Sequence, residues 1–255
     1  MALFDTHAHY DAADFSEDRA PLLAALPAAG VALVVNPGCD VASSRAAAEL
    51  AEQFPHVYAA VGIHPEDCAA AGEAEFAAIR ALCGQRKVVA IGEIGLDYYW
   101  PENPPKARQQ AVFRRQMALA EELGLPVIVH DREAHGDSLA IVGEFPGVRG
   151  VFHCFSGSPE MAAELLKRGW YLGFDGPITY KNARRAPEVA ALTPPERMLV
   201  ETDAPYLSPV PLRGRRNDSR NLPYIVGKLA EWKGVSMAEM EQITYENGKR
   251  LFGLE

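Results

Sequence analysis

Cysteine is scarce in this chain, and no stretch is apolar for long enough to cross a bilayer. The four cysteines form no C-x-x-C pair. In a chain of 255 residues this favours reduced thiols over a disulfide framework. Apolar runs such as residues 31–35 are far shorter than the roughly 20 residues of a membrane helix. Because the N-terminus also lacks a basic segment followed by an apolar one, we expect a cytoplasmic protein.

Basic residues are outnumbered by acidic ones. The chain has 25 Lys and Arg against 34 Asp and Glu, a formal net charge of −9. No long basic tract is present, which argues against a protein that coats nucleic acid but not against an enzyme with a local cationic patch. The length suits either two small domains or one (β/α) barrel, which takes about 250 residues.

Short apolar runs alternate with helical patterns along the whole chain. The predicted strands are 3–6, 31–35, 57–63, 88–92, 126–129, 150–152, 171–174 and 198–203. The predicted helices are 18–29, 41–54, 73–83, 106–123, 138–145, 159–168, 222–233 and 237–251. A doubly wound open sheet would carry a glycine-rich phosphate turn after an early strand, and this chain has none. The pattern therefore predicts one domain over residues 1–255, a single (β/α)8 barrel of the TIM type.

A His-x-His pair follows the first predicted strand. Side chains alternate faces along a strand, so His7 and His9 point to the same side and can reach one ion. Imidazole is the commonest protein ligand of metals. Taken alone, the pair is equally consistent with two exposed histidines at a strand end.

The other ligand-type residues repeat this placement. Side chains of metal-binding type lie at the ends of the first, fourth, fifth, sixth and eighth predicted strands: His7, His9, Glu93, His130, His153 and Asp203. These ends meet at the mouth of a barrel, where barrel active sites lie. Chance does not readily place four of only seven histidines there. We therefore predict a metal site at the C-terminal mouth.

At this point the chain resembles the TatD-like metal-dependent hydrolases, a nuclease branch of the amidohydrolase-type barrels. The matching segments cover nearly the whole chain in order: FDTHAHYD (4–11), GIHPE (62–66), IGEIGLDYY (91–99), LPVIVHDR (125–132), HCFSGS (153–158), TYKNAR (179–184), ETDAPYL (201–207), RGRRN (213–217) and NGKRLFGL (247–254). Members often carry a histidine where this chain has Glu66, which puts substrate preference at that loop in doubt.

The resemblance implies a ligand set. His7, His9 and Asp203 would hold one divalent ion, His130 and His153 a second, and Glu93 would bridge the two. Two ions about 3.5–4 Å apart can clamp a phosphodiester and supply a nucleophile. Mixed histidine and carboxylate ligands suit zinc, manganese or magnesium.

The bridging position separates this chain from related barrels. Many of them use a carboxylated lysine from the fourth strand as the bridging anion. Here the only nearby lysine, Lys87, precedes the strand and is expected at the opposite end, while Glu93 occupies the mouth. This favours a TatD-type site over the phosphotriesterase and dihydroorotase types.

Several residues near the mouth are candidates for substrate contact. The basic loop with Arg213, Arg215 and Arg216 is either a solvated loop or a phosphate anchor, assisted by Lys181, and we favour the anchor. Tyr98, with Tyr99 and Trp100, either stacks on a base or packs at the rim. His64 either supports a ligand or contacts substrate. Cys154 is expected to point away from the mouth, into the helix layer.

The predicted function is hydrolysis of phosphodiesters at nucleic-acid ends, as a deoxyribonuclease of 3′–5′ exonuclease type acting on single strands. Asp203 and Glu93 are the predicted catalytic residues. The family also suggests deacylation of D-aminoacyl-tRNA. A mononuclear deaminase would leave Glu93 unexplained, and a non-catalytic metal-binding scaffold predicts missing ligands, although none is missing here. We expect a monomer.

Overall fold

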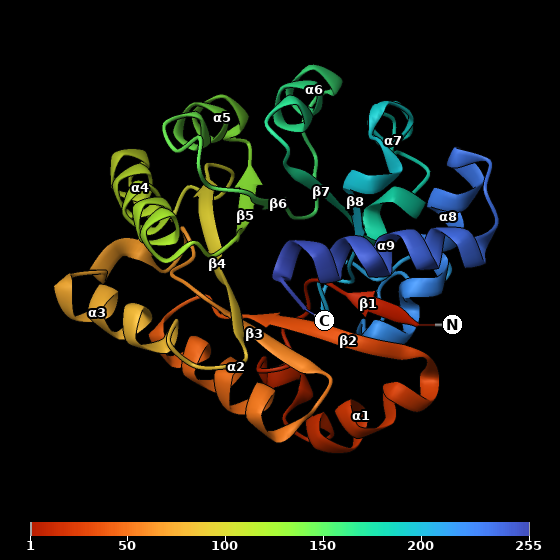
Figure 1. Cartoon of the computed structure of the whole chain (residues 1–255), viewed down its shortest axis with the longest axis horizontal. Helices are drawn as coiled ribbons and strands as arrows, with labels where there is room; N and C mark the ends of the chain where they lie inside the picture. The colour runs from red at the N-terminus through yellow and green to blue at the C-terminus, as the bar shows by residue number, and fades with distance from the viewer. Residues whose placement is uncertain (1, 255) are drawn as a thin grey trace.

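A parallel eight-stranded sheet forms the centre of the computed structural model, which describes residues 2–254 (Figure 1). The strands hydrogen-bond to one another in chain order. They are β1 (Leu3–Asp5), β2 (Val31–Pro37), β3 (Val57–Val61), β4 (Val88–Asp97), β5 (Val127–Arg132), β6 (Gly150–Phe152), β7 (Tyr171–Phe174) and β8 (Met198–Val200). Each strand from β1 to β7 pairs with its successor in parallel.

Backbone hydrogen bonds just beyond β8 and β1 join the two ends of the sheet. Asp203 N donates to His7 O over 2.9 Å, and His9 N donates to Ala204 O over 2.7 Å. We call this contact the closing seam. The sheet therefore curves round to its own first strand, and the (β/α)8 barrel predicted from the sequence is confirmed.

Nine helices of the described chain follow or flank the strands (Figure 1). They are α1 (Arg19–Ala25), α2 (Val41–Gln53), α3 (Glu73–Leu82), α4 (Lys106–Leu123), α5 (His135–Gly143), α6 (Pro159–Lys167), α7 (Ala186–Leu192), α8 (Leu222–Lys233) and α9 (Met237–Phe252). Helix α7 was not predicted, because its seven residues are too few to show a helical period. Within residues 2–254, no helix has the length and apolarity needed to cross a membrane.

Apolar side chains fill the inside of the barrel below its mouth. Ile128, Val151 and Leu199 belong to one buried cluster, which Leu251 and Phe252 of α9 also join. Residues two positions apart along a strand point to the same side, so the residue two positions after each of these three also points inward. Those residues are His130, His153 and Glu201. The packing thus places His130 and His153 at the mouth above an apolar interior, while Glu201 stays fully buried.

Candidate metal centre

His7 and His9 form the first half of the site. Their Nε2 atoms lie 3.0 Å apart. Both are close to Oε2 of Glu93, at 3.3 and 3.4 Å, and both lie 3.6 Å from Oδ1 of Asp203. Metal–ligand bonds of about 2.0–2.2 Å separate neighbouring ligand atoms by roughly 3–3.5 Å. The four side chains therefore have the spacing of a coordination shell.

His130 and His153 form the second half. The Nε2 atom of His153 lies 2.7 Å from Oε1 of Glu93, and Nδ1 of His130 lies 2.9 Å from the same oxygen. The two imidazole nitrogens are 3.2 Å apart. Glu93 thus points one carboxylate oxygen at each pair of histidines. This arrangement fits a carboxylate that bridges two cations.

Asp97 fixes the orientation of His130. Its Oδ2 lies 3.0 Å from Nε2 of His130. A neutral imidazole that donates its Nε2 proton to Asp97 presents the lone pair of Nδ1 to the site, as carboxylate-oriented metal ligands do. Burial opposes protonation of His130, but hydrogen bonds to Asp97 and Glu93 raise its pKa to about 10 when no cation is present. Sequence reasoning missed Asp97.

Strand β4 is longer than predicted, and this places both Glu93 and Asp97. Its pairing with β5 shifts register between Ile91 and Ile94 and then continues to Asp97. Gly95 adopts a φ of 142°, and a Cβ there would overlap the carbonyl oxygen of His130. Only glycine allows this close approach of β4 to β5. The IGEIGLD segment is therefore a strand with a local irregularity, not a strand followed by a loop.

The histidines stabilise the charge of Glu93. Burial opposes ionisation of its carboxyl, yet the nearby imidazoles of His153, His7 and His64 hold its pKa well below the usual range. At His7, burial disfavours the charged imidazole and holds the pKa well below its ordinary value. His7 therefore favours the neutral form, which is the form that binds metals.

Two carboxyl groups lie beneath the site and brace it. Glu201 accepts hydrogen bonds from Cys154 N over 2.6 Å and from Thr6 Oγ1 over 3.1 Å. Asp5 accepts from Thr202 N over 2.9 Å and from Thr202 Oγ1 over 2.6 Å. Burial raises the pKa of Glu201 well above its usual value and that of Asp5 to about 6. Both acids connect strands rather than face the mouth.

Known proteins share this architecture. The model of the family described as TatD related DNase matches residues 4–253. The chain belongs to the TatD family. It is therefore a metal-dependent hydrolase acting on ester bonds, and the resemblance drawn from the sequence is confirmed.

Individual relatives agree with this assignment. The chain is 43% identical over 252 residues to the uncharacterized metal-dependent hydrolase YabD of Bacillus subtilis, covering 98% of each. It is 38% identical over 261 residues to the 3′-5′ ssDNA/RNA exonuclease TatD of Cronobacter sakazakii, covering 98% of this chain and 97% of the relative. Among solved structures, the TatD homologue YJJV of Escherichia coli K12 is 31% identical, with a TM-score of 0.92 over 99% of this chain and 98% of that one.

His64 lies with the ligand-type residues of this TatD-family site. Its Nε2 is 3.6 Å from Oε1 of Glu93, and its ring centroid is 4.5 Å from that of His130. The backbone N–H of Glu66 donates to Nδ1 of His64 over 3.3 Å. In a neutral imidazole with Nδ1 as acceptor, Nε2 carries the proton. His64 thus turns Nε2 toward Glu93, and with Glu93 and His130 it forms a group whose ligand atoms lie close enough to hold one ion.

The basic loop after β8 is partly occupied by protein contacts. Arg216 donates to both carboxylate oxygens of Asp18, over 2.8 and 2.6 Å. Arg213 lies over the ring of Tyr180 at 4.5 Å. Arg215 is exposed. Of the three predicted phosphate anchors, Arg216 therefore already pairs with a carboxylate.

Tyr98 lies between α4 and α5 rather than open to the mouth. Its hydroxyl donates to Oδ2 of Asp137 over 2.8 Å and accepts from Nε2 of Gln110 over 2.9 Å. The ammonium group of Lys106 covers its ring at 4.2 Å. These contacts are those of a packing residue.

Other residues near the rim are open to solvent. Tyr99 and Trp100 are 49% and 42% exposed, and the guanidinium of Arg132 lies over both rings, at 4.0 and 5.2 Å. Lys181 is exposed after β7. The rim thus offers aromatic surface and cations that the helix layer does not occupy.

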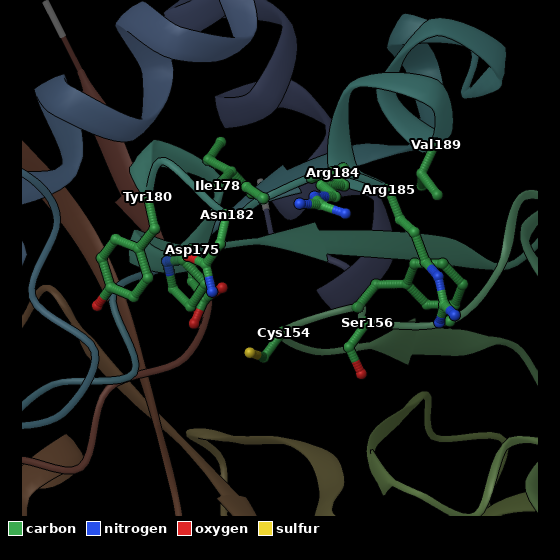
Figure 2. Close-up of a pocket in the computed structure, with 14 residues that line it drawn as sticks. Cys154, Ser156, Asp175, Ile178, Tyr180, Asn182, Arg184, Arg185 and Val189 are labelled. Carbon is green, nitrogen blue, oxygen red and sulfur yellow. The ribbon is translucent and has the colours of Figure 1, made fainter.

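The prediction that Cys154 points into the helix layer is wrong. Strand β6 ends at Phe152, and Cys154 has a φ of 43°. Alternation of side chains holds only in extended backbone, so it no longer applies at Cys154. Its side chain instead lines a pocket beside the site, together with Asp175 (Figure 2).

Proposed function

We propose that this protein is a nuclease that removes nucleotides from the 3′ ends of single-stranded nucleic acid, DNA above all, by metal-dependent hydrolysis of the phosphodiester. The observation that carries the proposal is the Glu93 carboxylate, which points one oxygen at each of two histidine pairs. The name of the Cronobacter sakazakii relative, an ssDNA/RNA exonuclease, supports the substrate class.

The ligands are proposed as the resemblance implies. One divalent ion would be held by His7, His9 and Asp203 and a second by His130 and His153, with Glu93 between them. When bound, such a pair supplies Lewis-acid stabilisation of phosphate charge and lowers the pKa of water. The spacing of the ligand atoms fits this loading, and the metal is zinc, manganese or magnesium.

Asp203 is proposed as the general base. Its side chain is 14% exposed at the mouth, whereas that of Glu201 is fully buried. Burial raises the pKa of Asp203 in the absence of a cation. A neighbouring cation lowers the pKa of a carboxyl group, so the loaded site keeps Asp203 ionised and able to accept a proton.

Substrate contacts are proposed around the rim. His64 would contact a phosphate oxygen through Nε2, which lies 3.6 Å from Oε1 of Glu93. Arg213, Arg215 and Lys181 supply cations for the phosphates that follow. The base-stacking role predicted for Tyr98 is better filled by Tyr99 and its neighbour Trp100, because both rings are exposed.

The decisive experiment incubates the purified, metal-loaded protein with single-stranded oligonucleotides labelled at either end. Shortening of 5′-labelled DNA one nucleotide at a time, with metal content measured on the same sample, supports the proposal. A D-aminoacyl-tRNA ester and a nucleoside amine are run in parallel. Hydrolysis of the ester alone would favour the deacylase, and release of ammonia alone would favour the deaminase.

A further inference from the structure

A pocket of about 360 Å³ lies beside the metal centre, between the segments that follow β6 and β7 (Figure 2). It begins one residue after the predicted ligand His153, because Cys154 is part of its wall. The remaining apolar wall comes from Phe155, Pro177, Ile178 and Val189. The volume lies in the range of small-ligand pockets. Its position makes it an extension of the proposed active site.

The floor of the pocket carries a buried acid with a free oxygen. Asp175 is 2% exposed, and its Oδ2 has no hydrogen-bond partner in the described structure. Burial raises the pKa of Asp175 well above its usual value, and the thiol of Cys154 is its hydrogen-bonding neighbour. A neutral carboxylic acid offers a donor and an acceptor side by side. An unpaired polar group at this depth is costly unless a ligand completes it.

The upper part of the pocket adds an amide and positive charge. Asn182 lies on the same side of the pocket as Asp175 and Tyr180, while the exposed Arg184 and Arg185 line it toward Val189 (Figure 2). Asn side chains form paired hydrogen bonds with base edges, and Arg side chains bind phosphate oxygens. The lining therefore matches a flat ligand that has apolar faces, a polar edge and an attached phosphate.

We propose that this pocket receives the base of the 3′-terminal nucleotide, with Asp175 and Asn182 bonding to its edge. This inference rests on the proposed exonuclease function and adds the way in which the strand end is recognised. An adjacent base pocket would align the last phosphodiester with the metal centre. Activity should then depend on the presence of a terminal base.

The test compares two 5′-labelled oligonucleotides that differ only at the 3′ end, one natural and one with a tetrahydrofuran abasic residue. A bonded base edge discriminates by about 1–3 kcal/mol. Wild-type protein should therefore show kcat/KM on the natural end roughly 5- to 150-fold above that on the abasic end. Asp175→Leu and Asn182→Ala should lower only the natural-end value. Asp175→Asn, which keeps a donor and an acceptor, should restore most of the preference.

Each outcome decides a different point. Equal cleavage of both ends by the wild type, or an equal decrease on both ends in the variants, would overturn the base pocket and leave the exonuclease proposal standing. Cleavage of neither end by the metal-loaded wild type would overturn the exonuclease proposal and the pocket with it. Asn182 is exposed, so its variant tests the pocket even where a change at Asp175 prevents folding. Arg149→Ala, an exposed change next to β6 at the opposite end of the barrel, is the control.

Discussion

At the scale of single residues, the proposal assigns proton transfer to Asp203, beside the histidines and Glu93 that would hold the metal. Its Oδ1 is 3.6 Å from both Nε2 atoms of His7 and His9. It also lies at the closing seam, where its N–H donates to His7 O. The position of Asp203 is therefore held by backbone contacts that do not need its charge.

Asp203→Asn should lower kcat on a phosphodiester by about 100-fold or more, as expected when a general base is removed. The amide keeps the shape and one oxygen ligand, so metal content should change much less. Turnover and elemental analysis on the same preparations test this. A variant that keeps its metals and most of its turnover would show that another residue accepts the proton.

Asp97 offers a second test, because it acts on the site only through His130. Asp97→Asn weakens the hydrogen bond that orients the ring, and such changes typically reduce metal affinity by about 10- to 100-fold. Titration against a chelator measures the decrease. Asp131→Asn is the matched control, since Asp131 follows His130 but bonds to His135 and Ser138. Equal affinity in the wild type and Asp97→Asn would rule out this positioning role.

At this scale, the sequence predicted the side-chain directions that follow from alternation along a strand. His7, His9, His130 and His153 come directly after apolar runs, so their common direction was readable from the sequence. The direction of Asp97 could not be predicted, because the IGEIGLD segment reads as the end of a strand. In the structure the strand continues through a register shift to Asp97. Cys154 was misassigned because a positive φ interrupts the period, and no sequence signal announces that conformation for cysteine.

At the scale of elements, the loop after β8 is anchored to the segment before α1. Arg216 pairs with Asp18, and its guanidinium lies 4.8 Å from the ring of Phe15. From its charges alone, the sequence predicts the same role, phosphate binding, for all three arginines of the loop. The structure distinguishes them, because one carries an internal partner that lies 198 residues away in the sequence.

This difference predicts unequal effects on nucleic-acid binding. Arg213→Ala with Arg215→Ala should weaken single-stranded DNA binding and reduce its salt slope by about 0.7 for each phosphate that the loop no longer neutralises. Arg216→Ala should leave the slope unchanged, because its charge is already paired. Binding measured across a range of salt concentrations tests both variants. A larger slope change for Arg216→Ala than for the double variant would contradict the assignment.

Helices were predicted best where their ends carry clear signals. The bounds of α4 and α8 match the predictions, and each ends at a glycine with positive φ, Gly124 and Gly234. Helix α7 lacks such a stop and is short. The end of β8 was placed three residues too late, because the ladder with β7 ends at Val200 and Asp203 has a positive φ of 54°.

At the scale of the whole molecule, the candidate ligands lie within or directly after five different strands, so a bound metal would cross-link the barrel. Ligands that bind only the folded state stabilise it, by about 2.7 kcal/mol at a concentration 100 times Kd. We therefore expect removal of metal by a chelator to lower Tm, and reconstitution to restore it with two ions per chain. Calorimetry and elemental analysis test this. Saturation at one ion per chain would contradict the binuclear site.

The one-domain organisation, the monomeric state and the cytoplasmic location stay predictions. The barrel itself was readable from the alternation of apolar runs and helices. The pocket beside β7 was not, because it depends on how the segments after β6 and β7 lie in space.

The closing seam also has a consequence for synthesis on the ribosome. His7 and His9 are translated roughly 10 to 40 s before Asp203, at about 5–20 residues per second. Throughout that interval the nascent chain presents the histidine pair without the carboxylate of Asp203. A cation captured early would be held by an incomplete set of ligands, because the full set exists only after the last strand closes the ring.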